Sequence, residues 1–126
     1  MTCFEAERQL VLFLAETLDL IPDREIFSDA LPDGVPEGVW AKFEQGRPAT
    51  LSSTNSFTAR VRGRYLSREE CADKAASVAS VLPVFGVGGL LAVRVGEGTQ
   101  ITFSRPEKAD RLPCFEFSIE LTVNFI

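Results

Sequence analysis

The sequence predicts an α+β domain: a mostly antiparallel sheet with two helices packed on one of its faces. Two segments begin with a helix-capping pattern and then carry apolar residues at helical spacing. Several others alternate apolar and polar residues, as strands with one buried face do. The length of 126 residues and the hydrophobic share of 45% suit one domain with a proper core. The expected order is α-β-β-β-α-β-β-β, in a single domain that spans residues 1–126.

The first expected element is a helix from about Cys3 to Leu20. Thr2 and Glu5 have the spacing of a capping box, and Pro22 supplies a stop. The apolar side chains that recur on one side of this helix are Leu10, Val11, Leu14 and Leu18.

Three strands are expected next, over Glu25–Ser28, Val39–Phe43 and Phe57–Arg64. A turn-rich loop, Asp29–Glu37, joins the first two of them. The second connection, Gln45–Ser56, has almost no apolar content, so we expect it to be a mobile loop.

A second helix is expected from the capping pattern Ser67–Glu70 to about Leu82, where Pro83 ends it. Its small side chains would let it lie close against the sheet. The residues of its expected buried stripe are Cys71, Ala75, Val78, Ala79 and Leu82.

The remaining chain is expected to form three strands. Leu90–Val95 and Gln100–Ser104 are predicted to be a hairpin whose turn is Gly96–Thr99. Gly86–Gly89, just before it, is expected to be a flexible turn, because no Gly-Lys-Ser/Thr pattern or helix follows. The last strand, Cys114–Ile126, alternates large apolar and polar residues without error, which indicates one face on the core and one in water.

The composition argues against catalysis. Histidine, the usual general base and commonest metal ligand, is absent. The cysteines at positions 3, 71 and 114 form no CxxC pair, so we expect small buried hydrophobes in a reducing compartment. Glu116 and Glu120 share a strand face but lie about 13 Å apart, beyond the roughly 5–9.5 Å of a glycosidase pair. We therefore expect no enzyme, no metal and no cofactor.

Charge and hydropathy also limit the partners. The net charge of −5 argues against sequence-specific nucleic acid as the ligand. No apolar stretch approaches the roughly 20 residues of a bilayer span, and the first residues lack the basic segment of a signal peptide. We therefore expect no membrane association and a location in the cytoplasm of the producing cell.

The only basic concentration in the sequence is formed by Arg60, Arg62, Arg64 and Arg68. Alternate spacing puts the first three side chains on one face of a strand. Two roles are open for it. The stripe would contact phosphate or an acidic partner subunit, or its side chains would pair across the sheet with carboxylates such as Glu116 and Glu120.

Three segments, taken with the element order, share a pattern with a known protein family. The first is the N-terminal helix, the short strand and the turn Leu31–Pro36. The second is an arginine-bearing strand, Ala59–Tyr65, that runs into the alanine- and glutamate-containing start of a helix, Ser67–Ala72. The third is Phe103–Pro106, a polar loop, and a long amphipathic strand that closes in Val123–Phe125. In these segments the chain resembles the tail-terminator and minor-capsid (head–tail joining) proteins of tailed bacteriophages.

This resemblance implies a virion structural protein with no catalytic residues to carry over. It implies a homo-oligomeric ring, commonly a hexamer, that caps the tail tube and joins it to the head. The implied partners are further copies of the chain, the tail tube protein and a head-completion (connector) protein. The implied locations are the virion and, during assembly, the host bacterial cytoplasm. Such rings are held by sheet edges and by mobile loops that reach a neighbour.

We expect the subunit or tail-tube interface on the polar loop and on the arginine-bearing face. Gln45–Ser56 exceeds the 2–5 residues that a hairpin connection needs, so the surplus is free to reach a neighbour. Trp40 either lies at the centre of this interface or packs beneath a loop of its own domain. The expected interface residues are Trp40, Arg47, Leu51, Asn55, Arg60, Arg62 and Arg64.

Two other functions stay open. One is a different ring subunit of the virion, such as a head-closure or tail-tube protein. The other is a small-ligand-binding or enzymatic α+β domain, which needs a pocket with convergent polar groups. Solution size separates a monomer from a ring.

Overall fold

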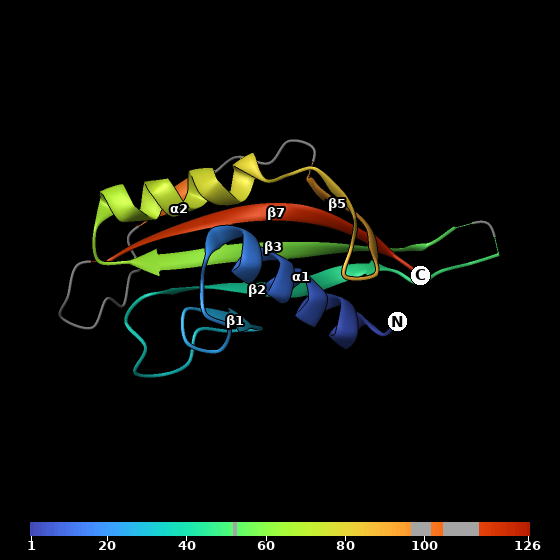
Figure 1. The fold of residues 1–126 in the computed structure, drawn as a ribbon, viewed down its shortest axis with the longest axis horizontal. Coiled ribbons are helices and arrows are strands. Elements are labelled where there is room, and N and C mark those ends of the chain that lie inside the picture. Colours follow the sequence, from blue (N-terminus) through green and yellow to red (C-terminus); the bar gives the residue numbers. More distant parts are fainter. Residues whose placement is uncertain (52, 97–101, 105–113) are drawn as a thin grey trace.

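The computed structural model describes residues 1–51, 53–96, 102–104 and 114–126. The described residues form a seven-stranded sheet with two helices packed against one face, which confirms the predicted α+β class (Figure 1). The elements in chain order are α1 (Cys3–Leu18), β1 (Ile26–Ser28), β2 (Gly38–Arg47), β3 (Asn55–Tyr65), α2 (Arg68–Ser80), β4 (Val84–Val87), β5 (Leu90–Val95), β6 (Thr102–Ser104) and β7 (Phe115–Phe125).

The first helix begins at the predicted capping box. The Thr2 hydroxyl accepts a hydrogen bond from the Glu5 N–H, and the Glu5 carboxylate accepts one from the Thr2 N–H. The helix ends earlier than predicted, because Asp19 takes a left-handed conformation at φ 56° before Pro22 is reached. The residues that α1 buries are Ala6, Leu10, Val11, Leu14 and Ala15.

The second helix also begins where predicted, with the Ser67 hydroxyl accepting the Glu70 N–H. Of the predicted stripe, Cys71, Ala75 and Val78 are fully or nearly fully buried, while Ala79 and Leu82 are half-buried. The helix is therefore in contact with the sheet mainly through its first three turns.

The sheet has the order β1-β2-β3-β7-β5-β4, with β6 also pairing with β7. Among the strand pairs that the structure describes, β1–β2 is parallel and the others are antiparallel. The longest pairing joins Asn55–Tyr65 of β3 to Phe115–Phe125 of β7, residue for residue. These two long strands therefore form the centre of the sheet (Figure 1).

The prediction that Gln45–Ser56 is a loop is wrong at both ends. Gln45, Gly46 and Arg47 continue β2, opposite Thr58, Phe57 and Ser56 of β3. A bulge between Phe43 and Gln45 marks the start of this extension. The sequence is polar there, but long-range pairing supplies the backbone partners, and hydrogen bonding overrides low strand propensity. The connection is thus a short tip on a long hairpin.

The predicted hairpin between β5 and β6 is also wrong. Val95 of β5 lies opposite Leu121 of β7, and Thr102 of β6 lies opposite Ser118. Because β3 occupies the other edge of β7 along its whole length, β5 and β6 follow one another along the same edge. The predicted turn residues beyond Gly96 lie outside the described residues.

One strand was missed. β4 pairs with β5, Val84 opposite Val93 and Val87 opposite Leu90. The turn between them is Gly88–Gly89, both at positive φ, so half of the predicted glycine turn is right. Gly86 and Val87 belong to β4 instead.

The predicted alternation of the last strand is confirmed. The buried side chains of β7 are Phe117, Ile119, Leu121, Val123 and Phe125, and they join one core with residues of both helices. The intervening polar residues face the side that no described helix covers (Figure 1). This uncovered side is called the open face below.

Candidate interaction surfaces

The arginine stripe lies on the open face, as predicted. Arg60, Arg62 and Arg64 alternate along β3 with Val61 and Gly63, which are buried on the core side. The three arginines differ in what they contact, and this difference decides which of them a partner can bind.

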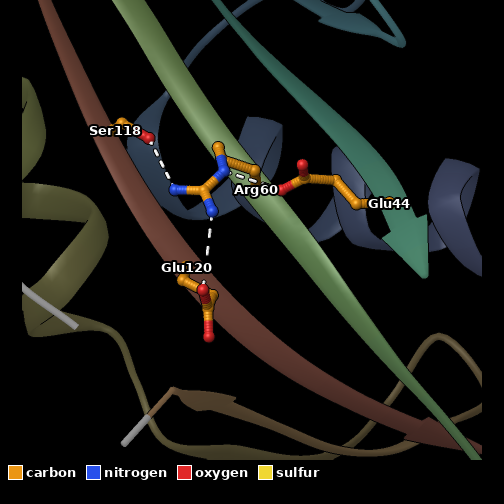
Figure 2. Close-up of polar contacts among 4 residues, drawn as sticks. All are labelled: Glu44, Arg60, Ser118 and Glu120. Carbon is orange, nitrogen blue, oxygen red and sulfur yellow. Dashed lines mark hydrogen bonds and ion pairs between the residues drawn. The ribbon is translucent and has the colours of Figure 1, made fainter. Parts of the chain in front are cut away.

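Arg60 is held by three partners from its own domain (Figure 2). Its Nε donates to Oε1 of Glu44 at 2.6 Å, one terminal nitrogen donates to Ser118 Oγ at 3.1 Å, and the other to Glu120 Oε2 at 3.4 Å. Glu44 is the residue of the β2 bulge, so this irregularity aims its carboxylate at the arginine. Its partners leave Arg60 29% exposed.

Arg64, four residues further along β3, is also paired with a carboxylate of its own domain. Its Nε and a terminal nitrogen reach Oε1 of Glu116 at 2.8 and 2.6 Å. Its guanidinium also lies 5.9 Å from the ring centre of Trp40, within cation–π range. The cross-strand alternative is therefore confirmed for Arg60 and Arg64. Partly exposed pairs of this kind contribute about 0.2–1 kcal/mol each.

Arg62 stands between them without such a partner. It lies opposite Trp40 on β2 and Ser118 on β7, is exposed, and makes no hydrogen bond or ion pair with any described residue. Beside it the open face is hollowed by a depression of about 480 Å³. The depression is lined by Asp29, Ala30, Trp40, Lys42, Glu44, Arg60 and Arg62. Trp40 is half-buried in its wall.

The other predicted interface residues lie on the hairpin. Arg47 ends β2 and is exposed, and Leu51 at the tip is fully exposed. Asn55 begins β3, and its Oδ1 accepts the Ala49 N–H at 2.8 Å, which braces the tip. In Figure 1 the hairpin projects past the end of the sheet. At about 3.3 Å per residue, Asn55 lies roughly 23 Å from Arg62 along β3. The predicted residues therefore form two separate surfaces, and their role as an interface stays a prediction.

An aromatic surface at the base of the hairpin was missed. Phe43, Phe57 and Phe125 stack with ring centres 5.6–6.2 Å apart, and Phe4 beside them is 79% exposed. A recess of about 300 Å³ lies between α1 and these strands, lined by Cys3, Phe4, Glu7, Phe43, Glu44, Gln45 and Phe57. The sequence carried one signal for it: Phe4 precedes Val11 by seven residues, so both lie on the same side of the helix.

Carboxylates gather at the opposite end of β3. Burial, followed by the charges of Glu70, Glu37 and Glu25, raises the pKa of Tyr65 far above its ordinary value. Glu37 accepts the Leu66 N–H and Glu25 accepts the Ile21 N–H, both at 2.9 Å. These three glutamates, called the acidic end below, form no ion pair with a described residue.

Chemistry-bearing groups are scarce in the part of the chain that the structure covers. Within it, no three His, Cys, Asp or Glu side chains come close enough to hold a metal ion. Cys3, Cys71 and Cys114 are free thiols. The prediction that they are buried is confirmed for Cys71 and Cys114 and wrong for Cys3, which is exposed at the start of α1. None of the described helices has the length and apolar character to cross a membrane.

Comparisons with known proteins bear on the fold. No protein family profile and no curated protein sequence matches the chain. Among solved structures, one chain is similar over 95% of this chain and 91% of its own length, with 20% identity and a TM-score of 0.52. Another belongs to the virion of a native gene transfer agent (GTA) particle; it matches over 98% of both chains, with 13% identity and a TM-score of 0.55. At this identity the likeness establishes a shared fold.

Proposed function

We propose that this chain is a structural protein of a phage-like virion, and that it forms the ring that terminates the tail tube. The observation that carries the proposal is the end-to-end match, over 98% of both chains, to a protein of the gene transfer agent virion. Coverage of 98% on either side means that the whole fold, rather than one motif, is shared.

The surfaces of the domain support an assembly role. The hairpin tip places Leu51 and Arg47 in solvent, and the aromatic surface leaves Phe4 uncovered. Exposed large apolar side chains that gather at one end of a small domain are typical of protein contacts. The two depressions described above, of about 300 and 480 Å³, are both partly open to solvent.

The proposal is tested by solution mass and by electron microscopy. We expect the purified protein, alone or with tail tubes of the same particle, to form closed rings of several subunits. A hexamer would have six times the 13.8 kDa mass of the chain. Rings should be seen at tube ends. A protein that stays monomeric at all concentrations and ignores the tubes would contradict the proposal.

The same experiment separates the other virion roles. A tail-tube protein would polymerise into long tubes, and a head-closure protein would bind the head connector while leaving tube ends bare. Rings found only at tube ends favour the terminator.

A further inference from the structure

Of the three arginines on β3, Arg62 is the one without an ion-pair partner among the described residues. Each of the three arginines of β3 has a cross-strand partner on β7: Arg64 lies opposite Glu116, Arg62 opposite Ser118, and Arg60 opposite Glu120. The partner of Arg62 is therefore a hydroxyl, whereas the partners of Arg60 and Arg64 are carboxylates. Arg62 lies between two arginines whose charges are already offset by carboxylates, so its own guanidinium is the one left to bind an added anion.

The surroundings of Arg62 fit a protein carboxylate. Within the depression, Asp29 pairs with Lys42 at 3.4 Å and Glu44 pairs with Arg60, so Arg62 supplies the uncompensated charge. Trp40 lies directly opposite and offers an aromatic wall for an apolar side chain. Tryptophan and arginine together are the residue types most enriched at the energetic centres of interfaces. Arginine also binds carboxylates in a two-pronged geometry.

The same chain carries a matching anionic surface. Glu25, Glu37 and Glu70 of the acidic end lack an ion-pair partner among the described residues, in a chain of net charge −5. Glu70 belongs to α2, on the helix side of the sheet, whereas Arg62 is on the open side. The two surfaces are therefore on different sides of one subunit, and different neighbours can meet them.

We propose that the depression at Trp40 and Arg62 is a docking site for a second copy of this chain, and that its occupant is the acidic end. The inference rests on the proposed function, because a closed ring needs two different, complementary surfaces on each subunit. Arg62 binds a carboxylate of the neighbour, Trp40 packs against the apolar part of the same segment, and Arg60 and Arg64 hold the site in shape.

Charge reversal tests the docking. Arg62→Glu should raise the concentration needed for ring formation by roughly ten- to a hundredfold, because it sets a carboxylate against the acidic end. Its melting temperature should not change, since Arg62 bonds to no described residue. Arg94→Glu is the matched control: the same change at an exposed arginine outside both the depression and the acidic end should leave the rings intact.

The complementary variant tests the occupant. Glu70→Lys should weaken the rings as Arg62→Glu does, and the chain that carries both changes should recover them, because the pair is re-formed with its charges exchanged. Glu69→Lys, an exposed neighbour that does not act on Tyr65, is the control.

The outcomes separate the two proposals. Arg62→Glu rings of parental mass and stability, or no recovery in the double variant, would overturn the docking and leave the ring itself intact. A parent chain that never assembles would overturn the proposed function. DNA oligonucleotide binding that Arg62→Glu abolishes while ring mass stays constant would overturn the docking in favour of a phosphate site.

Discussion

Glu7 of α1 accepts a 2.9 Å hydrogen bond from the backbone N–H of Phe43 on β2. The bond fastens the helix to the sheet one residue before Glu44, where the register of β2 shifts. Just beyond that point Cys3 and Phe4 of α1 line the recess together with Gln45, and the rest of the hairpin projects past the sheet (Figure 1). Glu7 therefore marks where the covered part of β2 ends and its projecting part begins.

Replacing Glu7 tests this role. Glu7→Ala leaves the partly buried Phe43 N–H without its acceptor, so the free energy of unfolding should fall by about 1–3 kcal/mol. Glu7→Gln keeps an acceptor oxygen in nearly the same position, so its free energy of unfolding should fall clearly less than that of Glu7→Ala. Urea unfolding measures both. Equal losses would show that the carboxylate charge, rather than the hydrogen bond, matters.

The hairpin tip should be dispensable for folding and needed for assembly. Replacing residues 48–55 by Asn-Gly closes β2 onto β3 at the Arg47–Ser56 pair with a two-residue turn. We expect a cooperative melt with little change in midpoint and a loss of rings in light scattering. Leu51→Ser is the milder companion, since a fully exposed side chain contributes nothing to its own core. Rings of unchanged mass in both variants would place the interface elsewhere.

Gly63 should tolerate no side chain. It lies opposite Phe117 in the β3–β7 pair, and a methyl group added there would collide with the Phe117 ring. Gly63→Ala should lower the free energy of unfolding by about 1–3 kcal/mol through overpacking. Adding Phe117→Leu to the same chain should recover part of the loss relative to Phe117→Leu alone. Additive effects would show that the two residues are not in conflict.

The thiols should differ in reactivity and in response to pH. Burial, and to a smaller extent the charge of Glu116, raises the pKa of the Cys71 thiol to about 11. At pH 8 a thiol reagent should therefore label the exposed Cys3 quickly, and Cys71 only after unfolding. Fast labelling of both in the folded protein would contradict this.

The raised pKa of Cys71 also makes the free energy of unfolding depend on pH in the alkaline range. The folded state favours the neutral thiol, so its contribution is kept below about pH 9, the ordinary value, and is lost as the pH rises toward 11. Cys71→Ala removes the titrating group and should lose less stability across this range than the parent. Urea unfolding at pH 8 and pH 10.5 provides the comparison.

The parts of the fold that depend on local chemistry could be predicted from the sequence. Both helices begin at their capping residues, Thr2 and Ser67, because a side chain near the N–H groups settles where a helix starts. The alternation of β7 predicted its two faces without error, because one side of the strand is dry and the other is wet.

The parts of the fold that depend on pairing with residues distant in the sequence could not be predicted. The hairpin extension is polar, and it is a strand because β3 lies opposite it and β7 supports β3 as far as Asn55. β4 is four residues long and contains Gly86, so it has no period of its own to detect. β5 and β6 were assigned to each other because they are near in sequence, whereas both pair with β7.

The site shows the same division. Alternate spacing placed the three arginines on one face, and it named Glu116 and Glu120 as partners. Only the register of the β3–β7 pair reveals that Arg62 lies opposite Ser118 and so has no cross-strand carboxylate. The difference between a paired and an available arginine is thus a property of strand alignment.

The outermost strands of the sheet, β1 and β4, have three and four residues. Few unpaired backbone groups remain on β1 and β4 themselves, but β1 reaches only as far as Ala41 of β2. Among the described residues, Lys42–Arg47 of β2 therefore has no strand partner on its outer edge. At the projecting hairpin the sheet offers another molecule a strand edge as well as side chains, and the charges of Lys42 and Arg47 limit unspecific pairing there.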